Sequence, residues 1–351
     1  MKQKNFTVDN NIDFSSFNVS EKSNVVSGYL NTLFNANICN SIITLDVFHQ
    51  DESQTISLLY DYMMISDAVI SHIEKESDKF ILVNNLDNLD EFQKNMTSIV
   101  LSYANPALLS SRPEIIRQMY RLGFRALTIK SDLFVDEYTP TVINQEIINE
   151  ANQLNMIINC SGFDDHLFDL LSNSKLMVSN IGSYTVCPNP RNISDDDLVE
   201  LKERGNLISL SLDDFYLSKN YFQEVTKLRE IADWEIKYLE VEYNFDSPEL
   251  ELKKKQIYRM LENKINDVKS VDISFDELIN HIVHINKLIG TDHIHLATGF
   301  GEIIDNENAN YYKLDEINDI LVQKLLSAGF DNDIVGNMLA GNMLNFIVRK
   351  K

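Results

Sequence analysis

The 351-residue chain is short of positive charge, and this shortage limits the partners that it can bind. It carries 31 Lys and Arg side chains against 53 Asp and Glu, which gives a formal net charge of −22. A surface of this sign repels the phosphates of nucleic acids and the head groups of anionic lipids. We therefore expect neither nucleic acid nor membrane as a partner.

Long apolar runs and paired cysteines are also missing. No stretch approaches the roughly 20 apolar residues that cross a bilayer, and the opening MKQKNFTVDNNIDF lacks the continuous apolar segment of a secretory signal. The cysteines Cys39, Cys160 and Cys187 show no CxxC spacing, which argues against a thiolate zinc site and fits a reducing compartment. We expect a cytoplasmic protein in which Cys39 and Cys160 pack in the core.

Short apolar runs recur along the chain with amphipathic segments between them. This pattern is typical of a parallel sheet built from repeated β-α units. Eight runs are expected as strands, at residues 41–48, 80–84, 97–103, 125–130, 155–161, 176–181, 207–212 and 293–300. Because eight parallel strands close a barrel, the predicted fold class is α/β, a (β/α)8 TIM barrel.

Start and stop signals mark the helices between these runs. Pro113 suits a first helical turn and Gly123 suits the end of the same helix. Ser194 is expected as the N-cap of a helix that ends before Gly205, with acidic residues in its first turn. Two further helices are expected to close the chain, over about 315–328 and 332–347.

Two segments fall outside the repeat. Residues 1–38 are polar and asparagine-rich, and we expect an N-terminal extension draped over a barrel that occupies 39–351. Residues 214–270 interrupt the repeat before the last strand. Their two apolar stripes predict an inserted helical hairpin, which could be a lid, an interface or a structural decoration: Val225, Leu228, Ala232, Ile236 and Leu239, then Ile257, Leu261 and Ile265.

The expected site region has few groups capable of catalysis. Barrel enzymes place their chemistry at the C-terminal ends of the strands, and a hydrolytic metal site needs several His, Asp or Glu side chains there. Only the first strand end offers a His-x-Asp pair, His49 and Asp51. GFGE, at 299–302, is too short for a dinucleotide loop, and the sequence has no Walker motif.

The remaining ionisable candidates have structural explanations. His281 and His284 are three apart on a helix, a spacing that could hold a metal ion, but packing is favoured for both. Burial explains two histidines on the last strand, and solvation explains an acidic pair after the seventh strand. These residues, together with one histidine that could reach the rim of the pocket, are His293, His295, Asp213, Asp214 and His166.

Four segments resemble, in collinear order, those of the renal or membrane dipeptidases, peptidase family M19. They are YRLGFRALTI (120–129), SNIGSYTVCPNPRNISDDDL (179–198), ELINHIVHINKLIGTDHIHLATGFGE (277–302) and DNDIVGNMLAGNMLNFI (331–347). The resemblance covers roughly residues 40–347. It implies the amidohydrolase-like barrel of two-zinc dipeptidases.

The resemblance also assigns positions to the site, and most of them are degenerate. Arg191 and Asn192 fall on the family's Arg-Asn pair, whose arginine binds the substrate carboxylate, a task that suits a bidentate guanidinium. The metal and catalytic positions fall on Ser102 for the bridging glutamate, Gly162 and Asn180 for two zinc histidines, Ser131 for a substrate-binding histidine, Gly299 for an assisting aspartate, and Asp46 and Phe48 for the first-strand HxD. A one-residue insertion would place His49 and Asp51 at that last pair instead.

Neutral side chains at these positions cannot hold two dications, which need an anionic bridge and matched donors. Our leading hypothesis is a pseudoenzyme without a metal cofactor that binds a peptide or another small carboxylate at Arg191. A second hypothesis is a zinc-dependent metallodipeptidase with relocated ligands, centred on His49, Asp51 and either Asp46 or Asp213. A third is an interaction scaffold, in which the 214–270 hairpin grips a partner or a second copy to form a homodimer.

Overall fold

A single parallel sheet organises the chain in the computed structural model, which describes residues 6–13, 19–35, 38–46, 55–92, 96–104, 112–130, 145–243, 247–268, 275–296 and 314–349. Within these ranges nine strands pair in the order β1-β2-β4-β5-β6-β7-β8-β9, with β3 added beside β4. The strands are β1 (Phe6–Asp13), β2 (Ile38–Asp46), β3 (Phe80–Leu82), β4 (Thr97–Ala104), β5 (Phe124–Lys130), β6 (Ile157–Ser161), β7 (Leu176–Ile181), β8 (Leu207–Leu210) and β9 (Ile294–Leu296).

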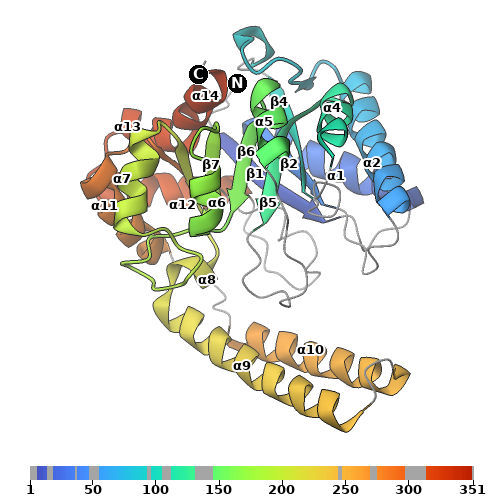
Figure 1. The fold of residues 1–351 in the computed structure, drawn as a ribbon. Helices are drawn as coiled ribbons and strands as arrows, with labels where there is room; N and C mark the ends of the chain where they lie inside the picture. The colour runs from blue at the N-terminus through green and yellow to red at the C-terminus, as the bar shows by residue number, and fades with distance from the viewer. Residues whose placement is uncertain are drawn as a thin grey trace.

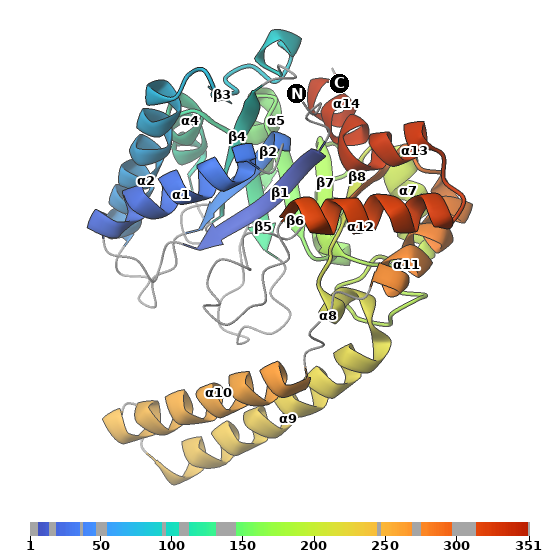
Figure 2. The same cartoon turned by 180° about the vertical axis from the view of Figure 1, so that it is seen from behind.

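Helices surround the curved sheet, as Figures 1 and 2 show from opposite sides. They are α1 (Val19–Asn35), α2 (Thr55–Lys75), α4 (Pro113–Arg121), α5 (Gln145–Gln153), α6 (Asp165–Leu170), α7 (Asp195–Glu203), α8 (Asp214–Leu217), α9 (Lys219–Glu242), α10 (Pro248–Val268), α11 (Phe275–Ile289), α12 (Leu314–Ser327), α13 (Asn332–Gly336), the π-helix η4 (Asn337–Gly341) and α14 (Asn342–Val348). A short 3-10 helix, η2, spans Leu89–Glu91. In the described part of the chain, no helix is long and apolar enough to span a membrane.

The α/β barrel class is confirmed, although the described strands leave a seam. The described parts of β1 and β9, the first and last strands of the order, share no ladder, and η4 contacts both of them. The predicted helix starts are confirmed: α4 begins at Pro113, and Ser194 is the N-cap of α7. The Ser194 hydroxyl accepts a hydrogen bond from the Asp197 amide.

The N-terminal region differs from the expected extension. Strand β1 pairs in parallel with β2, and α1 follows it, so most of residues 1–38 is a β-α unit of the sheet rather than a segment draped over it. The sequence did not predict this strand, because FTVDNNID has only three apolar residues in eight and because Asp and Asn are poor strand formers. The expected strand at 80–84 is instead the short β3, beside β4 alone.

The two faces of the strands build two apolar layers, because successive side chains alternate across a sheet. One face packs against the surrounding helices. On the other face an inner cluster forms near the strand starts, from Ile42, Val100, Ala126, Ile157, Met177 and Leu207 together with Met343, Phe346 and Ile347 of α14. The C-terminal helix therefore plugs the N-terminal end of the barrel.

A buried lysine fixes this plug. Lys175 lies just before β7 and is 5% exposed, and its Nζ donates to the carbonyl oxygens of Ile347 and Arg349 at the end of α14. Arg349 in turn donates from its guanidinium to the Gly205 carbonyl at 3.0 Å. These contacts satisfy carbonyls at a helix end that have no partner inside the helix.

Replacement of Lys175 should loosen the plug. Lys175→Met removes two charge-assisted hydrogen bonds and leaves buried carbonyls without donors, so the free energy of unfolding should fall by about 2–3 kcal/mol. Urea denaturation measures this change. The control is Lys202→Met on the exposed side of α7, and an equal effect of the two substitutions would contradict the role of Lys175.

Candidate active site

A polar layer lies directly above the apolar plug on the inner face of the sheet. Its members from β2 to β8 each come two residues after a plug residue, and all of the layer is buried. They are Thr44, Ser102, Thr128, Asn159, Ser179, Ser209 and, on β9, His295. The layer therefore separates the apolar plug from the C-terminal end of the barrel.

Thr128 is the hub of this layer. Its Oγ1 lies 2.9 Å from Thr44 Oγ1 and 2.8 Å from Ser102 Oγ, and the Asn159 amide donates to it at 3.4 Å. On the far side of the barrel Ser209 Oγ lies 2.9 Å from His295 Nδ1. The side chains of β2, β4, β5 and β6 are thus linked by neutral hydrogen bonds.

The ends of β6 and β7 are also joined by a neutral contact. Asn180 has the left-handed backbone φ of 53°, and its Nδ2 donates to Ser161 Oγ at 3.0 Å. The next residue, Gly162, also has a positive φ, of 81°, and its amide donates to the Ser179 carbonyl at 2.7 Å. Both strand ends therefore turn sharply at the place where they face each other.

Arg191 reaches the end of β6 from the loop that follows β7. Its guanidinium donates to the Ser161 carbonyl at 3.1 Å and lies 5.8 Å from the centroid of the Tyr216 ring. Its Nε is buried without a hydrogen-bond partner. Since a buried donor without an acceptor is costly, this side chain is poised for an added acceptor.

Asn192 holds the loop that carries Arg191. It is 2% exposed, its Oδ1 accepts from the Gly182 amide at 2.6 Å, and its Nδ2 donates to the Cys187 and Tyr216 carbonyls at 3.0 and 2.8 Å. Gly182 permits the close approach, because a Cβ there would lie 2.7 Å from the Tyr216 carbonyl oxygen and from the His281 ring. The amide of Asn192 is thus occupied by backbone groups.

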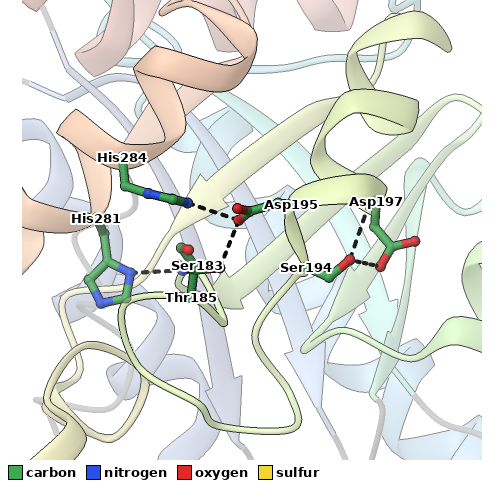
Figure 3. A network of polar contacts seen from close by, with 7 residues as sticks. All are labelled: Ser183, Thr185, Ser194, Asp195, Asp197, His281 and His284. Carbon is green, nitrogen blue, oxygen red and sulfur yellow. Dashed lines mark hydrogen bonds and ion pairs between the residues drawn. The ribbon is translucent and has the colours of Figure 1, made fainter.

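Helix α11 ties this loop down through two histidines (Figure 3). His281 Nδ1 accepts from the Ser183 amide at 2.7 Å, so the proton is assigned to Nε2, which donates to the Leu217 carbonyl at 3.0 Å. His284 Nε2 lies 2.8 Å from Asp195 Oδ1, which also accepts from Thr185. Both histidines pack against the loop and α7, in agreement with the expected packing role.

Short helix α8 is held at three successive carbonyls. Asn189 Nδ2 donates to the Phe215 carbonyl, Asn192 Nδ2 to that of Tyr216, and His281 Nε2 to that of Leu217. These three carbonyls close the C-terminal turn of a helix too short to satisfy them internally. The ring of Tyr216, which lies beside Arg191, is thereby fixed in place.

A family model described as Membrane dipeptidase (Peptidase family M19) matches residues 39–350. The chain belongs to peptidase family M19. It is 22% identical over 283 residues to Dipeptidase 3 of Mus musculus, covering 75% of this chain and 46% of that one. It is 21% identical over 296 residues to Dipeptidase verJ of Clonostachys rogersoniana, covering 79% and 62%. The chain thus spans about half the length of the curated relatives it matches.

Solved structures of peptidases share the fold. The probable dipeptidase PvdM from Pseudomonas aeruginosa superposes with a TM-score of 0.67 at 14% identity, covering 91% of this chain and 87% of that one. A metallo peptidase from Rhodobacter sphaeroides, liganded with a phosphinate mimic of the dipeptide L-Ala-D-Ala, gives 0.65 at 11% identity, covering 98% and 99%. At these identities the likeness shows the fold alone.

The described positions that the resemblance assigned to metal ligands carry neutral groups, which are the wrong donors for zinc. Ser102 contributes a neutral hydroxyl, Asn180 an amide and Gly162 no side chain, and the first two are already hydrogen bonded. Zinc sites in proteins use thiolate, imidazole and carboxylate ligands. Across the described ranges, no three His, Cys, Asp or Glu side chains converge to hold a metal ion, and the residues that the resemblance assigned do not fit a dinuclear zinc centre.

The other expected site residues are distributed as follows. The expected solvation of the acidic pair is wrong for Asp214, which is buried, while Asp213 accepts from the Phe215 amide as the N-cap of α8. His293 Nδ1 lies 2.8 Å from the Asn206 carbonyl oxygen. Asp46 ends β2 and His166 lies in α6. The side chains of these two, and all of Phe48, His49, Asp51, Ser131 and Gly299, lie outside the described residues.

Reading the strands for their polar positions could have found Thr44, Thr128, Asn159 and Ser179. Each is a small polar residue inside an otherwise apolar run, at a period-two position relative to the plug. The three cysteines are buried and form no disulfide, with Cys39 and Cys160 in the interior as expected. Burial raises the pKa of the Cys160 thiol to about 12, so this thiol stays protonated beside Arg191.

Acid should weaken the attachment of α11. Burial lowers the pKa of His281 to about 4, below its ordinary value of 6.5, so the unfolded chain takes up a proton at a pH where the folded chain does not. His281 therefore costs no stability above about pH 6.5, and stability is lost as the pH falls toward about 4. The free energy of unfolding should be about 2 kcal/mol lower at about pH 5 than at about pH 7.5.

Urea denaturation at both pH values checks this, with His281→Gln as the comparison. The variant lacks the titrating group, so its pH-dependent loss should be smaller by about the same 2 kcal/mol. Equal losses in the two proteins would show that His281 does not titrate as its burial requires.

Proposed function

We propose that this M19 chain binds a peptide or another small carboxylate at the mouth of its barrel and does not carry out two-zinc hydrolysis. The proposal rests on the hydrogen bonds between neutral side chains at the positions that the resemblance assigned to metal ligands. Ser102 joins the Thr128 hydroxyl, and Asn180 joins Ser161, so each polar group is stabilised without a cation. A dinuclear centre needs an anionic bridge at the position of Ser102.

Arg191 supports the binding part of the proposal. Its position over the end of β6 is set by the loop that Asn192 holds, and its buried Nε has no acceptor in the described chain. A carboxylate would supply two acceptors in the plane of the guanidinium, which is the geometry that this group prefers. The Tyr216 ring beside it offers an apolar wall.

The cellular location is part of the same proposal. The three cysteines are buried and free of disulfides, which suits a reducing compartment, and we assign the protein to the cytoplasm. Recovery of the protein from a non-cytoplasmic fraction of its cells would remove this assignment.

Metal analysis tests the loss of the zinc centre. After dialysis, the purified chain should retain well under one zinc per chain, and L-Ala-D-Ala should not be hydrolysed with added zinc, cobalt or manganese, because the described donors are neutral. Two tightly held zinc ions would overturn the proposal. Hydrolysis that chelators abolish would favour the metallodipeptidase with ligands on His49 and Asp51, and His49→Ala would then abolish it.

Calorimetric titration with L-Ala-D-Ala tests Arg191. A charge-assisted hydrogen bond is worth about 1.5–3 kcal/mol, so Arg191→Met should weaken binding roughly 10- to 100-fold. The control is Arg259→Met, on the exposed surface of α10, which should leave affinity unchanged. The C-terminal amide of the same dipeptide should bind the wild type as weakly as the free acid binds Arg191→Met. Equal affinity of wild type and Arg191→Met would refute a carboxylate site at this arginine.

A further inference from the structure

Helix α9 of the inserted hairpin has a second apolar face that is not buried within the hairpin. Helices α9 and α10 lie side by side and project away from the barrel in both views (Figures 1 and 2). The face of α9 toward α10 buries Val225, Ala232 and Ile236, as the apolar pattern predicted. A surface helix usually has only one such face.

A second stripe runs along the outer side of α9. Ile231, Trp234, Tyr238 and Val241, here called the outer stripe, are 50, 75, 70 and 89% exposed. Trp234 is the single tryptophan of the chain. Together with Glu235, Leu239 and Ile257, two members of the stripe line a groove of about 470 Å³. A contiguous exposed patch of large apolar side chains marks an interaction surface.

The spacing of the outer stripe reads the same in both directions. Its steps of three, four and three residues follow the a/d pattern of a helix that packs against another helix. If two copies of α9 meet antiparallel about a two-fold axis, Ile231 lies opposite Val241, and Trp234 lies opposite Tyr238. Aliphatic side chains then meet at both ends and aromatic side chains in the middle, as an isologous contact requires.

Charge also favours a second copy at this surface. Helices α9 and α10 together carry nine basic and ten acidic side chains, so nearly all of the net charge of −22 lies elsewhere in the chain. Two such chains repel each other least when they meet at their hairpins, and the projection of the hairpin keeps the acidic barrels apart. A nearly neutral apolar face offers little to a strongly charged partner.

We propose that the outer stripe joins two copies of this chain through antiparallel α9 helices. The interface contains one helix from each copy, so the dimer should be of moderate strength and should form in the micromolar range.

Sedimentation velocity over about 1–200 µM tests the proposal. The wild type should pass from monomer to dimer, while Trp234→Lys and Tyr238→Lys should stay monomeric with unchanged thermal unfolding, since both side chains are largely exposed. The matched control is Met63→Lys on α2, which is 50% exposed and should dimerise like the wild type. A wild type that stays monomeric throughout, or a dimer that survives both substitutions, would overturn the proposal.

The fluorescence of Trp234 reports on the stripe itself. Its emission should shift to shorter wavelength with rising concentration in the wild type but not in Val241→Lys. Added salt should tighten the dimer, because it screens the repulsion between two acidic chains, and weakening by salt would overturn an apolar contact. Co-sedimentation with neutral phosphatidylcholine vesicles, abolished by Trp234→Lys, would replace the second copy with a lipid surface.

Discussion

A buried hydroxyl or amide that lacks a partner costs about 1–3 kcal/mol, and this cost governs the inside of the barrel. The plug fills the N-terminal half with apolar side chains, so most polar side chains above it find their partners within the layer. Among the described residues, the Ser179 hydroxyl and the Asn159 Oδ1 are buried there without a partner. The Thr128 hydroxyl is the shared hydrogen-bond partner of Thr44, Ser102 and Asn159. Because each contact crosses from one strand to another, the layer also fixes how these strands sit relative to one another.

The same constraint accounts for the neutral side chains at the described positions that the resemblance assigned to metal ligands. A buried carboxylate at one of these positions would face a large desolvation cost without a cation beside it. A hydroxyl at Ser102 and an amide at Asn180 avoid that cost, because each can bond to a neutral neighbour. These two positions thus form hydrogen bonds between neutral groups, and introducing one acidic side chain alone would leave an unpaired buried charge.

Local signals predicted much of the fold, and long-range geometry accounts for what they missed. The start of α7 at its Ser194 cap, and the α9 face toward α10, follow from short patterns that act within a few residues. Strand β1 was missed because its partner β2, and not its own polar sequence, makes it a strand. The contact of Thr44 with Thr128 joins residues 84 positions apart, so it depends on the stagger of the barrel. The resemblance predicted the role of Arg191. Only the folded loop shows that the side-chain amide of Asn192 forms hydrogen bonds with backbone groups.

Helix α8 connects the arginine site to the hairpin. Its three bonded carbonyls anchor it to the loop after β7 and to α11, and α9 begins only two residues after Leu217, with Ser218 as its cap. Tyr216 lies beside Arg191, while Phe215 packs at 5.4 Å from Phe222 of α9. A displacement of α9 must therefore strain either this aromatic contact or the hydrogen bonds that hold Tyr216. Linked equilibria are reciprocal. If a ligand at Arg191 and a partner on α9 both favour the same position of α8, each strengthens the binding of the other by the same factor.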